Sequence, residues 1–433
     1  MSFTVFDGVA VVAVLLAIPA WMLAVRLAGR RFGWQPEVSR KLVHVGTGCL
    51  ALCFPLLFSS PLPVLILVAI AIPFMLAIRQ GVLGGIGSVL HGVQRQSYGE
   101  IYLALAIAIT FLRAQEQPVL YVLPILVITL SDTAAALVGT AYARARFPVE
   151  GGAKSIEGVV VFFVVTWLAS LITLVLLTRA EPVNLVLISM LIAAFCALVE
   201  VDSWHGLDNL FVPIGAFLLL ARHIASDPID LTAAAGIFLV FLSVMLWIAT
   251  ALNVPRQAAR AYAILLFLIL SIVSMHNIVL PALAIAAHLA ARALRPSESK
   301  RPDFDLLFVA AMMSLFWMFV GDASYRSVIS LFNLSFAGAA LGFFALVLRG
   351  YWRLLIVPAA GLAVVLSLWT TQANLPFSHW FMPTPLETGL SMLVAAALPI
   401  CRPDWFDRQR SLRVFGLAMI VPVALCVRGV ILP

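Results

Sequence analysis

Residues 159–177 read VVVFFVVTWLASLITLVLL, a run without a single charged side chain. A helix rises about 1.5 Å per residue, so a run of this length can cross the hydrocarbon core of a bilayer, which is about 30 Å thick. Residues 9–25 form a second uncharged run of similar length. Backbone polar groups must pair with one another inside hydrocarbon, and a helix satisfies them within one segment. Both stretches therefore predict transmembrane helices.

The rest of the chain has a similar composition. Of its 433 residues, 63% are hydrophobic and only 11% are charged, whereas soluble globular proteins carry about 25% charged residues. Long apolar runs alternate with short polar loops, which predicts an all-α polytopic bundle of about 13 to 16 transmembrane helices. The net charge is +7, but its Lys and Arg residues are scattered at the ends of spans. That distribution is typical of topology determinants and argues against nucleic-acid binding.

Lys and Arg collect in alternate loops, and this asymmetry predicts the orientation of the chain. Basic loops such as residues 30–41 and 144–154 alternate with loops such as 59–63 and 114–118, which carry almost no positive charge. By the positive-inside rule, the basic loops face the cytoplasm and the N-terminus lies outside. We therefore expect an integral protein of a plasma membrane, such as the bacterial inner membrane.

Polar residues are unevenly distributed between the two halves of the chain. Up to about residue 225, the predicted cytoplasmic loops contain dense runs of Asp, Glu, Lys, Ser and Gly, and beyond it such residues are sparser. We therefore divide the chain near Ser226-Asp227-Pro228. Residues 1–225 are expected to form a catalytic membrane domain, and residues 232–433 an additional transmembrane helical domain to which the sequence assigns no role.

The segment between residues 130 and 158 combines an acidic and a basic group. Asp132 lies near the predicted cytoplasmic end of an apolar helix, where an ionisable residue is costly and usually functional. Lys154 and Ser155 open the next span, and a helix N-terminus with such residues can bind phosphate. A carboxylate for Mg²⁺ and an ammonium group for phosphate oxygens indicate metal-bound nucleotide phosphates. A structural ion pair or a topology anchor is the alternative.

A second polar cluster comes earlier in the chain. Lys41 and His44 are three residues apart, so they share one helix face, and Arg40 stands beside them. This group could bind phosphate or orient a polar headgroup. His44 could equally be a packed, hydrogen-bonded residue of the helix bundle.

Two acidic clusters complete the set on the same predicted side. Glu100 opens a short span and could accept a proton, ligate a metal, pair with Arg95 or belong to a capped helix start. Glu200 ends one helix, and Asp208 and Asn209 open the next. Carboxylates and an amide at this position suit Mg²⁺ or a ribose hydroxyl, although Asp208 could also cap its helix. All four polar clusters lie on one predicted side of the membrane. This indicates an active site at the cytosolic surface that acts on a lipid-embedded substrate.

Taken in order, these clusters resemble the polyprenol kinase family, which includes phytol, farnesol and, more distantly, dolichol kinases and the CTP-dependent diacylglycerol kinase. That family is itself similar to the phosphatidate cytidylyltransferases. The matching marks are Arg40-Lys41-x-x-His44-x-x-x-Gly48, Ser97-Tyr98-Gly99-Glu100-Ile101-Tyr102, Asp132-x-x-Ala135-x-x-Val138-Gly139, Lys154-Ser155-Ile156-Glu157-Gly158, Glu200 and Asp208-Asn209-Leu210. The resemblance covers roughly residues 1–225. The chain departs from the family pattern at Ser131, where Gly is usual, and at Leu207, where a second acidic residue is common.

The resemblance implies transfer of a nucleotide γ-phosphate, with CTP as donor and Mg²⁺ as cofactor, to the hydroxyl of a membrane isoprenoid alcohol. Phytol, farnesol, geranylgeraniol and dolichol are the candidate acceptors. The resemblance assigns catalysis to Asp132, Lys154 and Glu100, nucleotide or phosphate binding to Arg40, Lys41, His44, Ser155 and Asn209, and metal binding to Asp132, Glu200 and Asp208.

Two other functions compete with this interpretation. A cytidylyltransferase would release pyrophosphate and form a CDP-lipid, but its C-terminal signature of two acidic residues beside a Ser is not found here. A lipid or metabolite transporter would suit the many spans. Transporter sites lie near the bilayer midplane, however, whereas the polar clusters of this chain lie at one surface.

Overall fold

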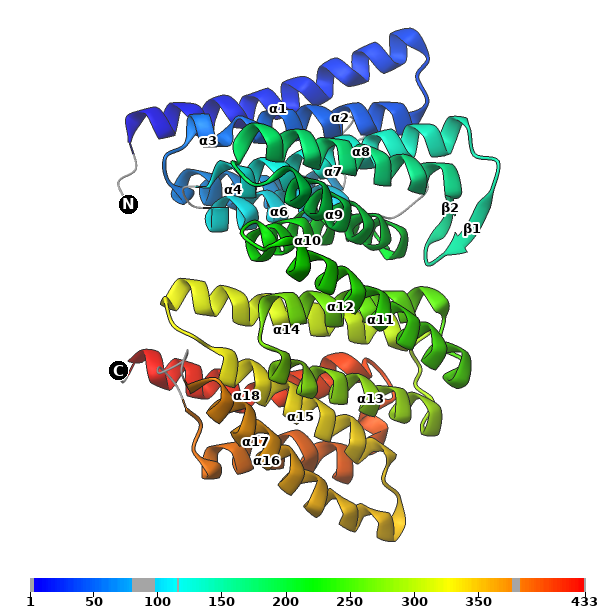
Figure 1. Ribbon diagram of the computed structural model, residues 1–433, viewed down its shortest axis with the longest axis vertical. Coiled ribbons are helices and arrows are strands. Elements are labelled where there is room, and N and C mark those ends of the chain that lie inside the picture. The colour runs from blue at the N-terminus through cyan, green and yellow to red at the C-terminus, as the bar shows by residue number, and fades with distance from the viewer. Residues whose placement is uncertain (1–3, 80–97, 115–116, 376–381, 432–433) are drawn as a thin grey trace. The chain divides into compact units, whose positions relative to one another are not determined.

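The computed structural model describes residues 4–79, 98–114, 117–375 and 382–431 (Figure 1). Within these ranges the chain is helical apart from short connections and one hairpin, so the predicted all-α class is confirmed. Arg95, the proposed partner of Glu100, and Ser97 of the family motif lie outside the described residues.

The chain forms two compact units, Met1–Leu239 and Val240–Pro433. The first unit contains α1 (Val5–Phe32), α2 (Pro36–Leu52), α3 (Phe54–Leu57), α4 (Pro61–Arg79), α6 (Gly99–Ala114), α7 (Pro118–Ala141), β1 (Arg146–Val149), β2 (Gly152–Ser155), α8 (Ile156–Leu177), α9 (Pro182–Asp202) and α10 (Asp208–His223). The division between the units falls within α11 (Pro228–Leu252). The long helices of the first unit run alongside one another, and the β1–β2 hairpin lies at one end of them (Figure 1).

The second unit is helical throughout its described residues. It contains α12 (Arg256–Ile272), α13 (Val279–Leu294), α14 (Pro302–Ser324), α15 (Ile329–Val347), α16 (Ile356–Ala373), α17 (Pro385–Cys401) and α18 (Arg410–Ile431), with 3-10 turns at Met275–Ile278, Gly350–Leu355 and Pro403–Phe406. The central helix of this unit is α15. In its most apolar stretch of 18 residues, 83% of the residues are buried, whereas the corresponding share is 17% for Gly350–Ala373, the segment that contains α16. The apolar outer face of α16 suits contact with lipid.

The described helices confirm an integral membrane protein. Eleven of them are long and apolar enough to cross a membrane, and Pro61–Ala77 and Pro385–Cys401 are shorter apolar helices. Large apolar side chains stay exposed on the outer faces, for example Leu239 at 61% and Trp247 at 71%. A lipid environment accounts for such surfaces, which a water-soluble protein of this size would rarely expose.

The second helix begins earlier than apolar length alone predicts. Apolar length places its start at residue 42, but α2 begins at Pro36. Proline fits the first helical position because its φ is preset and its missing N–H would be unpaired there. The polar residues Arg40 and Lys41 therefore lie inside the helix, and Lys41 is only 2% exposed.

Glycines allow the helices around the site to approach closely. A Cβ on Gly48 of α2 would collide with Thr129 of α7. Gly139 of α7 and Gly158 of α8 face each other, and a Cβ on Gly139 would lie 3.7 Å from the Gly158 Cα. Small residues at helix interfaces permit this packing in membranes. The Gly positions of the family motif therefore hold α2 and α8 against α7, the helix that carries Asp132.

A short β-hairpin, which the sequence does not predict, precedes α8. β1 and β2 pair antiparallel, with Phe147 opposite Lys154, and Gly151 turns the chain with a φ of 88°. Lys154 therefore lies on a strand and not at a helix start. Ser155 is the N-cap of α8, because its Oγ accepts the Gly158 N–H at 3.0 Å. Strands of four residues are too short to show a periodic pattern in the sequence.

We expect Gly48→Ala to destabilise the first unit. The added methyl group would collide with Thr129, whose hydroxyl is fixed by a 2.6 Å hydrogen bond to the Ile125 carbonyl, and such overpacking costs about 1–3 kcal/mol. Gly236→Ala on α11 is the matched control, since a Cβ there meets no described atom within 4 Å. Thermal unfolding in detergent should show a lower Tm for Gly48→Ala only. Equal Tm values would contradict the close contact of α2 with α7.

Candidate functional site

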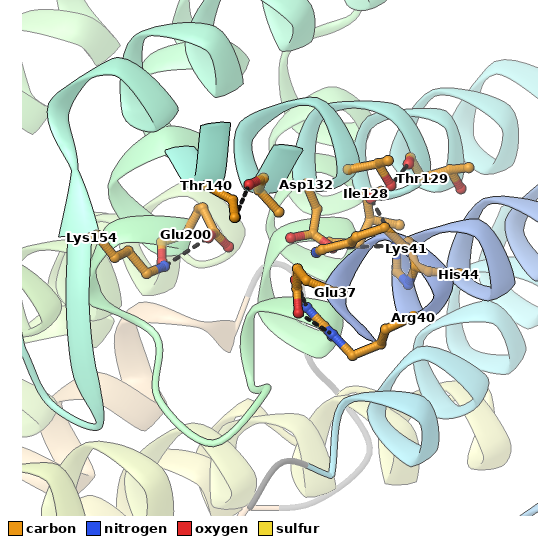
Figure 2. A network of polar contacts seen from close by, with 12 residues as sticks. Glu37, Arg40, Lys41, His44, Ile128, Thr129, Asp132, Thr140, Lys154 and Glu200 are labelled. Carbon is orange, nitrogen blue, oxygen red and sulfur yellow. Dashed lines mark hydrogen bonds and ion pairs between the residues drawn. The ribbon is translucent and has the colours of Figure 1, made fainter. Parts of the chain in front are cut away.

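Two lysine–carboxylate pairs lie close together in the first unit (Figure 2). The Lys41 Nζ donates to the Asp132 Oδ2 at 2.6 Å, and these side chains are only 3% and 7% exposed. The Lys154 Nζ donates to the Glu200 Oε1 at 2.7 Å and also to the Glu200 backbone carbonyl. The four residues come from α2, α7, β2 and α9. Long-range folding therefore brings together polar clusters that are far apart in the sequence.

A third carboxylate joins these pairs. Carboxylate oxygens of Asp132, Glu200 and Asp208 all lie within 4.8 Å of one another. Asp208 is the first residue of α10, and the N-cap position belongs to Leu207, which makes no side-chain capping bond. The alternative that Asp208 caps its helix is therefore wrong.

The chemistry of the three carboxylates fits a hard divalent cation. Such ions prefer oxygen ligands, and Mg²⁺ is commonly held by carboxylates together with substrate phosphates. The three carboxylates are paired with two lysines, and the nearby Arg40 is paired with Glu37. The Glu200 Oε2 is buried without a hydrogen-bond partner among the described residues. A buried carboxylate oxygen is costly to leave unpaired, and a metal ion would satisfy it. The residues that sequence analysis names as metal ligands are thus close together, and their metal binding stays a prediction.

His44 and Arg40 lie on the side of α2 next to Asp132. The His44 Nε2 is 3.1 Å from the Ile128 carbonyl oxygen and 3.5 Å from the Asp132 Oδ2. Because the carbonyl can only accept, Nε2 carries the hydrogen and Nδ1 the lone pair. Arg40 forms a two-pronged ion pair with Glu37, with its Nη2 at 2.6 Å and its Nε at 3.0 Å from the carboxylate oxygens. Glu37 has no counterpart in the family marks, and its spacing of three residues from Arg40 is the signal that could have found it.

The other predicted site residues, Ser155, Asn209 and Glu100, do not belong to the lysine–carboxylate pairs. The Ser155 hydroxyl caps α8 and is 7% exposed, which favours a structural role over a free phosphate ligand. Asn209 is 5% exposed, and its Oδ1 has no hydrogen-bond partner within the described part of the chain. Glu100 is half-buried in the first turn of α6 and is not one of the three clustered carboxylates.

An apolar cavity of about 270 Å³ begins at this site. Its polar lining residues are Arg40, His44, Thr47, Glu100 and Asn209. The remaining lining is apolar and comes from α1, α2, α3, α4 and α6. His44 lines the cavity and also lies 3.5 Å from Asp132, so the cavity and the carboxylates adjoin. No local pattern in the sequence predicts this cavity, because residues of six helices line it.

Comparisons with known proteins identify the family. No family model matches the chain, and no solved structure matches it. A curated phytol kinase from Synechocystis sp. is 30% identical to this chain in an alignment of 230 positions, and the alignment covers 92% of that protein and 47% of this chain. The chain belongs to the polyprenol kinase family. The resemblance inferred from the motifs is thereby confirmed, as is the expectation that the chain is a member of a family of lipid-alcohol kinases.

One departure from the polyprenol kinase pattern has a structural explanation. Ser131, which stands where the family usually has Gly, is fully buried in the interface between α7 and α8. The Thr166 Oγ1 donates to the Ser131 Oγ at 2.9 Å. The additional hydroxyl therefore joins these two helices and leaves the neighbouring Asp132 free to face α2.

The carboxylate cluster generates a prediction about metal binding. We expect Asp208→Asn to weaken Mn²⁺ binding by roughly tenfold or more, because it replaces an anionic ligand by a neutral one. Asp230→Asn on α11 is the control, since Asp230 is exposed and outside the cluster. Titration of the purified protein with Mn²⁺, followed by electron paramagnetic resonance, measures the free ion. Equal affinity in the two variants would contradict a metal site at Asp208.

Proposed function

We propose that this protein is a Mg²⁺-dependent kinase that transfers the γ-phosphate of a nucleoside triphosphate to a membrane isoprenoid alcohol. CTP is the donor that the family resemblance implies. The supporting observation is the junction of two features: three clustered carboxylates with two lysines, and an apolar cavity that starts beside them. A polar site for phosphates and an adjacent apolar site are what a lipid-alcohol kinase requires.

The catalytic part of the chain is the first unit. Every predicted site residue and every residue that lines the cavity lies within Met1–Leu239. We therefore propose that residues 1–225 form the kinase domain and that residues 232–433 form an additional helical domain. The positive-inside asymmetry supports a cytosolic location for the site, where nucleoside triphosphates are available.

The carboxylates and lysines would handle the nucleotide. Asp132, Glu200 and Asp208 would hold Mg²⁺, which supplies charge neutralisation for phosphate oxygens when it is bound. Lys41 and Lys154 each lie within hydrogen-bond distance of one of these carboxylates, so both ammonium groups can reach phosphate oxygens at the same place. Preorganised positive charge stabilises the transferring phosphoryl group.

The acceptor hydroxyl would lie at the polar end of the cavity. Its oxygen forms the new bond to the γ-phosphorus, the bond from that phosphorus to the leaving nucleoside diphosphate breaks, and the hydroxyl proton must be removed. His44 lines the cavity, and its Nδ1 carries the lone pair that can accept this proton. The nearby Asp132 would stabilise the resulting imidazolium, since its Oδ2 is 3.5 Å from the His44 Nε2. Asn209 lines the same end and can orient a hydroxyl or the nucleotide through its Oδ1, which has no hydrogen-bond partner among the residues that the structure describes.

The reaction is tested with CTP labelled in the γ-phosphate and a panel of farnesol, geranylgeraniol and phytol. We expect label in a prenyl phosphate and release of CDP. Asp132→Asn should lower kcat roughly hundredfold or more, because it removes a charge that holds the metal. Asp230→Asn is again the control, and equal Tm values would show that both variants are folded.

Other products would overturn the proposal. Pyrophosphate with a CDP-lipid would identify a cytidylyltransferase. Absence of labelled lipid with every alcohol and every nucleoside triphosphate would exclude a lipid-alcohol kinase. Full activity of Asp132→Asn would exclude the carboxylate cluster as the catalytic site.

A further inference from the structure

We infer that the apolar cavity is the binding site for the acceptor tail and that it encloses the first two or three isoprene units next to the hydroxyl. This inference rests on the proposed function and deepens it, since it assigns the residues that select the acceptor. It follows from the length of the cavity, its closed end and its volume.

The cavity runs along α2 from the polar site into the apolar interior. His44 lines its polar end, and Ala51 and Phe54 line it seven and ten residues further along the chain. At about 1.5 Å per residue, the separation of His44 and Ala51 along α2 corresponds to roughly 10 Å, and Phe54 lies beyond the end of that helix. On α6, Glu100 lines the polar end and Ile107 the apolar end, which gives about 10 Å. Both helices therefore indicate a slot that is only a few isoprene units long.

The apolar end of the cavity is closed by a packed aromatic cluster. The Phe54 ring makes edge-to-face contacts with Phe58 and Phe111, at centroid distances of 5.4 and 6.5 Å. Phe111 contacts Tyr121 in the same way at 5.2 Å, and the Tyr121 hydroxyl donates to the Ala51 carbonyl at 2.8 Å. Phe54 lines the cavity, and its contacts with this buried cluster hold its ring in place at the apolar end.

The volume gives a consistent estimate of capacity. One water-sized group occupies about 30 Å³, so a cavity of about 270 Å³ has room for at least the carbon atoms of roughly two isoprene units. A tail of this size would bury apolar surface against side chains that offer it no hydrogen-bonding groups, which is the favourable term in binding.

The wall on the α1 and α4 side provides a route from the bilayer. Ile70 lines the cavity although its side chain is 46% exposed, and Ile18 and Phe74 are only partly buried. An alcohol dissolved in lipid can reach the cavity through this apolar side without passing through water. The part of a longer tail that the cavity cannot hold can remain in lipid on the same side.

The test compares two Ala→Phe substitutions on one helix. Ala71 lines the cavity, whereas Ala69 is exposed and does not. Purified wild type, Ala71→Phe and Ala69→Phe are assayed with alcohols of one, two, three and four isoprene units. In the wild type, kcat/KM should rise up to two or three units and then level off. Ala71→Phe should lower kcat/KM at least tenfold for the three-unit alcohol and little for the one-unit alcohol, and Ala69→Phe should match wild type.

The outcomes separate this inference from the proposed function. If the wild type phosphorylates alcohols but Ala71→Phe equals Ala69→Phe at every length, the cavity is not the tail site while the kinase proposal stands. If the wild type phosphorylates no alcohol, the proposed function itself fails. Mn²⁺ binding provides a second readout, because Ala71→Phe should leave it unchanged. Loss of Mn²⁺ binding together with lost activity toward the one-unit alcohol would show that Ala71 supports the carboxylates and would contradict its place in the tail site.

Discussion

The buried contact between Lys41 and Asp132 is the interaction on which the site depends. A carboxylate inside a membrane helix bundle is stable only when an opposite charge or a metal lies beside it. The pair requires α2 to lie directly against α7, and the Gly48–Thr129 contact permits that approach. The same two helices place His44 between Asp132 and the apolar cavity. One packing contact therefore fixes the carboxylate, the lysine and the entrance of the proposed acceptor site.

Composition and motifs predict the helices and the residue types of the candidate site, but they do not predict which of these residues pair with one another. Uncharged runs such as residues 159–177 indicate the helices because hydrocarbon demands internally paired backbone. The residue types at Asp132, Glu200 and Asp208 indicate oxygen ligands. That Lys41 pairs with Asp132 and Lys154 with Glu200 is decided by tertiary packing, which no local pattern encodes. The β1–β2 hairpin and the cavity could not be predicted from local patterns, since the strands are short and residues of six helices line the cavity.

The second unit has polar interactions of its own, and they are of a different kind. The Asn333 Nδ2 donates to the Asn277 Oδ1 at 2.6 Å, and the Asn277 Nδ2 donates to the Asn374 Oδ1 at 3.0 Å. Buried amide networks of this kind specify one packing of membrane helices. Asp303 is surrounded by Tyr262, His288 and Arg292 within 3.4 Å. These networks join neighbouring helices, whereas the carboxylates of the first unit cluster beside an apolar cavity.

The central claim is that Asp132, Glu200 and Asp208 form one metal site next to the acceptor cavity. Its most direct test is an experimental structure of the protein with Mn²⁺ and a non-hydrolysable CTP analogue, in which anomalous scattering locates the metal. The account predicts a Mn²⁺ peak among the three carboxylates, with phosphate oxygens near Lys41 and Lys154. A nucleotide and metal bound elsewhere, with both lysine–carboxylate pairs unchanged, would contradict it.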